Sequence, residues 1–117
     1  MALVITDLCK SFPTRGGDLV VLRGINLELQ NGDALAVLGP SGSGKSTLLH
    51  LVGTLDRPTS GDITLDGENP FALADKDLAR FRNRHVGFVF QDHHLLPQCS
   101  VLENVLVPTL ADPRRNR

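Results

Sequence analysis

The sequence predicts an α/β fold in which an antiparallel β-layer precedes a core of alternating strands and helices. Two observations lead to this prediction. Apolar and polar residues alternate over residues 25–29, a pattern typical of a half-buried antiparallel strand. An apolar run at 34–38, a glycine-rich stretch and a second apolar run at 48–52 then follow in the order strand, loop, helix. With 117 residues, the chain is long enough for one domain and too short for two.

The first third of the chain predicts strands and tight turns. Residues 2–12 mix β-branched and alternating apolar positions and are expected to form a strand, followed by a turn at 13–18. A second strand is expected over 19–29, with the apolar side chains of its last part on one face. The Asn-Gly pair at 31–32 predicts a hairpin-type turn, and the run at 34–38 predicts a buried strand.

Helices and strands are expected to alternate farther along. Residues 46–54 predict a helix, and residues 62–65 predict a short strand that ends in an Asp-Gly turn. A second helix is expected over 75–84, with Asp75 as its N-cap, and a second apolar strand over 86–90.

A last helix is expected after Ser100, whose hydroxyl can cap it. One apolar face of this helix would be formed by Val101, Leu102, Val105 and Leu106.

Composition limits the classes of partner. The formal net charge of −1 argues against a polyanion-binding surface, so we expect no nucleic acid partner. Cys9 and Cys99 have no metal or redox spacing and are expected to be reduced thiols, as in cytosolic proteins. No apolar run approaches the ~20 residues that span a bilayer, and residues 1–10 lack the pattern of a signal peptide. We therefore expect a cytoplasmic protein whose membrane role, if any, is peripheral.

The glycine-rich stretch carries the chemistry. It matches the phosphate-binding pattern Gly-x-x-x-x-Gly-Lys-Ser/Thr between a predicted strand and a predicted helix. Its residues, called the phosphate loop below, are Gly39, Pro40, Ser41, Gly42, Ser43, Gly44, Lys45, Ser46 and Thr47.

Each residue type in the phosphate loop has a physical role. The glycines let the backbone curl around an anion so that successive N–H groups point inward. The helix that starts near Lys45 adds its positive dipole end and its unpaired N–H groups. Lys45 is expected to reach the β- and γ-phosphates, and the Ser46 hydroxyl is expected to bind Mg²⁺. The alternative is a glycine-serine loop that binds nothing.

Several blocks in the right order resemble the nucleotide-binding subunits of ABC transporters. They are residues 22–27, 39–47, 58–67, 84–91 and 95–105, which together span nearly the whole chain. The resemblance implies a P-loop NTPase fold of the ABC ATPase type with an N-terminal antiparallel β-layer, and it implies binding of ATP and Mg²⁺. The His-His-Leu-Leu-Pro and Glu-Asn-Val segments are similar to the branch that releases lipoproteins or drives macrolide-type efflux.

The resemblance assigns roles to two residues outside the phosphate loop. Gln91 matches the Q-loop glutamine, which implies a catalytic role through contacts with Mg²⁺ and the attacking water; its amide oxygen can bind a metal without adding charge. Phe12 matches the aromatic residue that stacks on adenine, and its ring keeps the π-face of the Tyr more usual in the family. The alternatives are a surface turn residue for Gln91 and a core side chain for Phe12.

The resemblance also implies partners and shows departures. The implied partners are a membrane permease, contacted through residues 91–106, and a second ATP-binding subunit in a homodimer on the inner face of the membrane. No Leu-Ser-Gly-Gly-Gln signature, no strand ending in Asp-Glu and no switch histidine follows residue 91. We therefore expect residues 1–117 to be the N-terminal part of one ABC-type domain, incomplete as a fold.

Two consequences are expected from this incompleteness. The chain alone should lack the general base for ATP hydrolysis, although the full-length protein would be an ATPase. Strand edges and apolar faces should be exposed, which favours aggregation. The rival interpretations are another P-loop enzyme, such as a kinase or GTPase, and a module that binds nucleotide without catalysis. The lid arginines of a kinase and the Asn-Lys-x-Asp motif of a GTPase are not visible in the sequence.

Overall fold

The structure, a computed structural model, describes residues 2–40, 42–89 and 95–108 of the chain. The chain divides into two compact units, Met1–Leu73 and Ala74–Arg117. Among these described residues, the first unit contains a β-sheet, one α-helix and a short 3₁₀-helix, η1 (Pro70–Ala72), and the second contains two α-helices.

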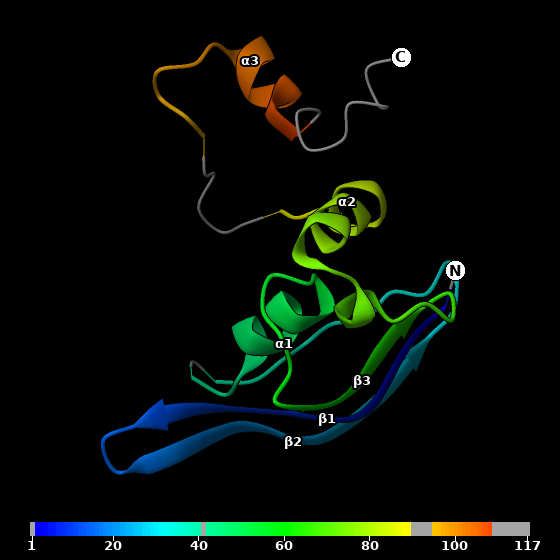
Figure 1. The fold of residues 1–117 in the computed structure, drawn as a ribbon, viewed down its shortest axis with the longest axis vertical. Coiled ribbons are helices and arrows are strands. Elements are labelled where there is room, and N and C mark those ends of the chain that lie inside the picture. Colours follow the sequence, from blue (N-terminus) through cyan, green and yellow to red (C-terminus); the bar gives the residue numbers. More distant parts are fainter. Residues whose placement is uncertain (1, 41, 90–94, 109–117) are drawn as a thin grey trace. The chain divides into compact units, whose positions relative to one another are not determined.

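A three-stranded antiparallel sheet organises the first unit (Figure 1). Its strands are β1 (Leu3–Thr14), β2 (Gly17–Leu29) and β3 (Ser60–Leu65), in the spatial order β2-β1-β3. Ile5 sits in the middle of the sheet and pairs with Leu27 on one side and Ile63 on the other. The predicted strands at 2–12, 19–29 and 62–65 are confirmed, with β1 and β2 extending farther into the predicted turn than expected.

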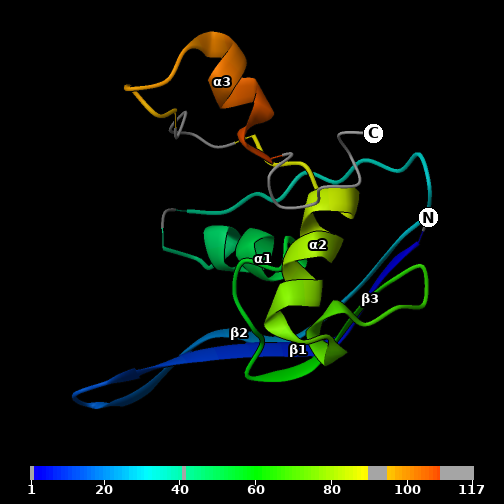
Figure 2. The same cartoon turned by 45° about the horizontal axis from the view of Figure 1, so that its top comes forward.

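Helix α1 (Lys45–Val52) covers one face of this sheet, as Figures 1 and 2 show. The leucines at positions 48 and 51 lie one turn apart on the helix and therefore share a face. The buried core consists of Ile5, Leu8, Leu22, Leu51 and Ile63, with Leu48, Val52 and Phe71 packed against it. Each fully buried aliphatic side chain stabilises the unit by about 1.5–3 kcal/mol. The predicted helix at 46–54 is confirmed, and it ends at Gly53.

Tight turns set the strand ends in the first unit. Asp66 and Gly67 have φ angles of 53° and 78°, and Leu65 and Glu68 exchange two backbone hydrogen bonds of 2.9 and 3.0 Å across them. This is the geometry of a type I′ turn, which the Asp-Gly pair favours. Gly61 (φ 88°) lies where a Cβ would come within 2.3 Å of the Asp7 carbonyl oxygen. Only glycine fits that approach of β3 to β1.

The prediction of strands at 34–38 and 86–90 is wrong, as far as the described residues 34–38 and 86–89 show. Residues 34–38 and 86–89 have no regular secondary structure. A strand is held by ladder hydrogen bonds, and within the described ranges neither segment belongs to a strand ladder. Apolar side chains in these segments are exposed, Leu38 to 88% and Val89 to 102%. The expected bare apolar surface is confirmed, and aggregation stays a prediction.

The second unit contains α2 (Asp75–His85) and α3 (Val101–Leu106). Helix α2 begins with Asp75 itself, and Ala74 occupies the N-cap position, so the prediction that Asp75 is the cap is wrong. Asp75 instead lies in the first turn, where a carboxylate interacts favourably with the helix dipole. Ser100 caps α3 as predicted, and its hydroxyl accepts from the Glu103 N–H at 3.1 Å.

Candidate functional site

The backbone of the phosphate loop curls through two left-handed glycines. Gly42 has φ 81° and Gly44 has φ 95°, in the region that favours glycine. The Ser43 N–H donates to the Pro40 carbonyl at 3.2 Å, which closes the loop on itself. An alanine Cβ at Gly39 would lie 2.8 Å from Ser43 Oγ, so the start of the loop is packed against its middle.

Gly44 joins the phosphate loop to the sheet. A Cβ at this position would lie 3.0 Å from Val21 Cγ1, 3.1 Å from Leu22 Cδ2 and 3.2 Å from the Val21 carbonyl oxygen. The loop therefore rests directly on β2. Gly44 is also the N-cap of α1, without a side-chain cap, and its carbonyl accepts from the Leu48 N–H at 2.9 Å. The helix start thus lies against the sheet at a position where the left-handed backbone and the close neighbours both favour glycine.

The cation of the site lies over the loop. Lys45 is the first residue of α1, and its ammonium donates to the Gly39 carbonyl at the opposite end of the loop. Ser46 is exposed in the first helical turn and Thr47 is half-buried beside it. The first N–H groups of a helix have no intrahelical acceptor. Lysine, hydroxyls and free amides therefore converge on the start of α1, an arrangement that suits a phosphate group.

Phe12 lies on β1, and the residue is 36% exposed. Lys10 Nζ is 5.0 Å from the centroid of this ring, within range of a cation–π contact. Lys10 pairs across the sheet with Leu22, the residue that touches Gly44. Phe12 is two residues farther along β1, about 7 Å at the usual strand rise. Phe12 is therefore an accessible aromatic side chain near the strand positions that carry the phosphate loop, and the interpretation of it as a fully buried core residue is wrong.

A second set of side chains forms an apolar pocket in the second unit. The pocket has a volume of about 540 Å³ and is lined by Leu95, Leu96, Pro97, Cys99, Val101, Asn104 and Val105. Asn104 shapes it by bonding to the backbone of the preceding loop. Its Oδ1 accepts from the Leu96 N–H at 2.8 Å, and its Nδ2 donates to the carbonyls of Leu96, Cys99 and Ser100. The four apolar residues predicted to share a face of α3 are all exposed.

The capping box of α3 perturbs one carboxylate. The Ser100 N–H donates to Glu103 Oε1 at 3.0 Å. This backbone hydrogen bond, joined by that of the Ser100 side chain, lowers the pKa of Glu103 from its ordinary value because both favour the ionised form.

Sequence reasoning placed most of the candidate site but missed some residues. Gly39, Pro40, Gly42, Ser43, Gly44, Lys45, Ser46 and Thr47 lie together in the phosphate loop and the start of α1. Ser41 and Gln91 lie outside the described residues. Lys10 and Asn104 were not singled out from the sequence. The Lys-x-Phe spacing on a strand could have indicated Lys10, because residues two apart share a face.

The fold and the phosphate loop define a protein of the P-loop nucleotide-binding class. Comparison with protein families makes this more specific: the ABC transporter family matches residues 22–117. The chain belongs to that family. Among the residues that the structure places, no helix has both the length and the apolar character needed to cross a membrane.

Individual relatives agree with this assignment. The chain is 58% identical over 110 residues to the lipoprotein-releasing system ATP-binding protein LolD 1 of Rhodopirellula baltica, covering 94% of this chain and 48% of that protein. It is 53% identical over 108 residues to the LolD protein of Geobacter metallireducens, covering 92% and 48%. The chain therefore spans about half the length of the curated relatives it matches.

Solved structures give the same fold. The dimeric, post-hydrolysis structure of the ATP-binding cassette MJ0796, bound to ADP and Pi, matches with a TM-score of 0.86 and 35% sequence identity. The match covers 92% of this chain and 47% of the cassette. This confirms the predicted P-loop NTPase fold of the ABC ATPase type with its N-terminal antiparallel layer.

Proposed function

We propose that the chain is the N-terminal part of the ATP-binding subunit of an ABC transporter. In this proposal the intact protein couples binding and hydrolysis of ATP to transport through a membrane permease. The observation that carries it is the phosphate loop: two left-handed glycines and a lysine that bonds back to the start of the loop, with Gly44 packed against β2 at the start of α1. A loop of this kind suits a triphosphate because a lysine and the unpaired N–H groups of a helix start both lie at one end of it.

Each residue of the site has a part in the proposal. The loop amides and Lys45 hold the β- and γ-phosphates, and Ser46 offers its hydroxyl oxygen to Mg²⁺. When bound, Mg²⁺ neutralises the charge that develops on the transferred phosphoryl group. Gln91 is proposed as the second metal contact and as the residue that orients water. Phe12 is proposed as the platform for the adenine ring because it is aromatic and accessible.

The proposed cargo and partners rest on the relatives. The similarity to LolD proteins supports lipoprotein release as the transport process, with macrolide-type efflux as the alternative. The surface over residues 91–106 is proposed to contact the permease. The exposed pocket beside Asn104 supports this part of the proposal, because large exposed apolar patches mark interaction sites. A second ATP-binding subunit is proposed as the dimer partner, on the inner face of the cell membrane.

Substitution of Lys45 tests the phosphate assignment. In the intact protein, Lys45→Ala should weaken Mg-ATP binding about ten- to hundredfold, because a charged hydrogen-bond donor to the phosphates is lost. Calorimetric titration measures the binding, and release of inorganic phosphate measures hydrolysis. Lys76→Ala is the matched control, since Lys76 is an exposed lysine in the first turn of α2. Unchanged ATP affinity in Lys45→Ala would show that the phosphates bind elsewhere, and binding without phosphate release in the wild type would favour a module without catalysis.

A further inference from the structure

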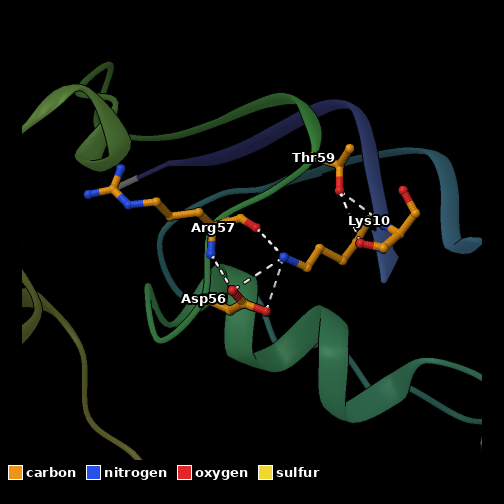
Figure 3. A network of polar contacts seen from close by, with 5 residues as sticks. Lys10, Asp56, Arg57 and Thr59 are labelled. Atoms are coloured by element: carbon orange, nitrogen blue, oxygen red, sulfur yellow. Dashed lines mark hydrogen bonds and ion pairs between the residues drawn. The ribbon is translucent and has the colours of Figure 1, made fainter. Parts of the chain in front are cut away.

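Lys10 is held by two acceptors from the segment that follows α1 (Figure 3). Its ammonium donates to the Arg57 carbonyl at 2.7 Å and lies 3.2 and 3.3 Å from the two carboxylate oxygens of Asp56. The Lys10 side chain is only 13% exposed, whereas that of Asp56 is 41% exposed. The lysine therefore does not extend its charged end into solvent, as lysine side chains ordinarily do.

A second set of bonds ties the same two segments together. The Ser11 N–H donates to Thr59 Oγ1 at 3.0 Å, and the Thr59 N–H donates to the Cys9 carbonyl at 3.0 Å. Figure 3 shows Thr59 on the same side of β1 as this network. Hydrogen bonds thus join residues 9–11 of β1 to residues 56–59. Lys10 is the charged residue in this part of β1.

The same ammonium lies over the ring of Phe12, 5.0 Å from its centroid. A cation at this distance is attracted to the negative face of the ring and limits the positions that the ring takes. Phe12 is otherwise a partly exposed residue close to the β1–β2 turn, where a lone aromatic side chain has few contacts to order it.

We propose that Lys10 is a positioning residue that aligns the base-binding aromatic Phe12 with the phosphate loop. Helix α1 connects the phosphate loop to the segment that holds Lys10. Lys45 is its first residue, Val52 is its last, and Asp56 follows four residues after Val52. A helix of this length is about 12 Å long and stiff. Lys10 therefore links the end of the segment that carries the phosphate contacts to the aromatic side chain. The proposal rests on the proposed binding of ATP by Phe12 and Lys45.

Comparison of two ligands separates positioning from a merely structural role. In the intact protein, titrations with Mg-ATP and with magnesium tripolyphosphate would be compared for the wild type, Lys10→Met and Asp56→Asn. Tripolyphosphate occupies only the phosphate loop. We expect about a fivefold loss of ATP affinity in both variants, within the range of a partly desolvated cation–π contact, and unchanged tripolyphosphate affinity. Lys10→Arg should restore most of the ATP affinity, because it keeps the cation over the ring.

Controls distinguish this proposal from the function on which it rests. Arg80→Gln removes another cation from an ion pair, 3.9 Å from Asp77 on α2, and should change neither affinity. An equal loss of both ligands in Lys10→Met and Asp56→Asn would make the network a general stabiliser and overturn the positioning role. Normal ATP affinity in these variants, with reduced ATP affinity in Phe12→Leu, would overturn the positioning role of Lys10. The proposed binding of adenine by Phe12 would still stand. Failure of the wild type to bind either ligand would instead reject the proposed function, and the positioning role with it.

Discussion

Gly44 rests against Val21 so closely that a single added carbon at Gly44 would lie 3.0 Å from Val21 Cγ1 and 3.2 Å from the Val21 carbonyl oxygen. The backbone of Gly44 is also left-handed, with φ 95°. Two separate physical demands therefore fall on one residue, which both starts α1 and seats the phosphate loop on the sheet. Few real Cβ atoms approach another atom this closely, so a side chain at this position would require Val21 and Leu22 to shift as well as a strained backbone.

Gly44→Ala should destabilise the first unit and weaken ATP binding together. Left-handed strain costs about 1–2 kcal/mol, and overpacking adds about 1–3 kcal/mol. We expect the free energy of unfolding to fall by about 2–5 kcal/mol, measured by urea denaturation. Gly32→Ala is the control, because Gly32 has φ 87° but no atom within reach of an added Cβ. Equal losses in the two variants would show that the contact with Val21 contributes nothing.

Ser46→Ala should separate metal-dependent from metal-independent binding. If the hydroxyl binds Mg²⁺, its removal should lower the affinity for Mg-ATP about tenfold, the effect of losing one hydrogen bond to a charged group. The affinity for ATP in the presence of EDTA should stay the same. Ser60→Ala serves as the control, since Ser60 is an exposed serine at the start of β3. A similar loss with and without magnesium would assign the hydroxyl to the phosphates instead.

Asn104→Ala should loosen the loop that forms the apolar pocket. The side chain makes four hydrogen bonds to the backbone, two of them with Leu96. Without them the Leu96 amide loses its acceptor, and its hydrogen exchange should accelerate about tenfold, as expected for a bond worth roughly 1 kcal/mol or more. Gln98→Ala, an exposed substitution in the same loop, should leave this exchange unchanged. If the pocket contacts a permease, Asn104→Ala should also weaken that complex.

The stability of α3 should depend on pH through Glu103. Its pKa is lowered in the folded state by the hydrogen bonds from Ser100, so the carboxylate stabilises the helix above the ordinary value of 4.5. This contribution is lost as the pH falls below that value toward the lowered pKa, because the unfolded state then binds more protons. Amide exchange of residues in α3, compared at pH 6 and pH 3.5 after correction for intrinsic rates, measures the effect. Glu103→Gln should abolish the pH dependence, and a persistent dependence would assign it to another group.

Local patterns in the sequence predicted the parts of the fold that depend on local interactions. The Asp-Gly turn after β3, the cap at Ser100 and the helix that begins at Lys45 each follow from a few neighbouring residues. The run at 34–38 has the composition of a buried strand, yet it forms none, since a strand requires partners that composition does not specify. Leu38 shows the result, with 88% of its surface exposed.

The candidate site also has a part that the sequence predicted and a part that it did not. The phosphate loop was predictable because its residues are contiguous and each has a fixed role. The link between Lys10 and Asp56 was not predictable, because 46 positions separate the two residues and only the folded sheet brings them together. Phe12 was chosen through family resemblance, and its role in binding adenine stays a prediction; the structure shows a partly exposed residue with a lysine ammonium 5.0 Å from its ring centroid.

Strand β1, which is synthesised before β2 and β3, is the middle strand of the sheet that the described residues form. Its hairpin partner β2 follows at once, but β3 ends at Leu65 and is made much later. Until then one edge of the nascent hairpin has open hydrogen-bonding groups, and Ile5 lacks its neighbour Ile63. The three-stranded sheet can therefore be completed only after β3 has been synthesised. If translation stalls earlier, the nascent chain has an unpaired strand edge that can bind chaperones or other nascent chains.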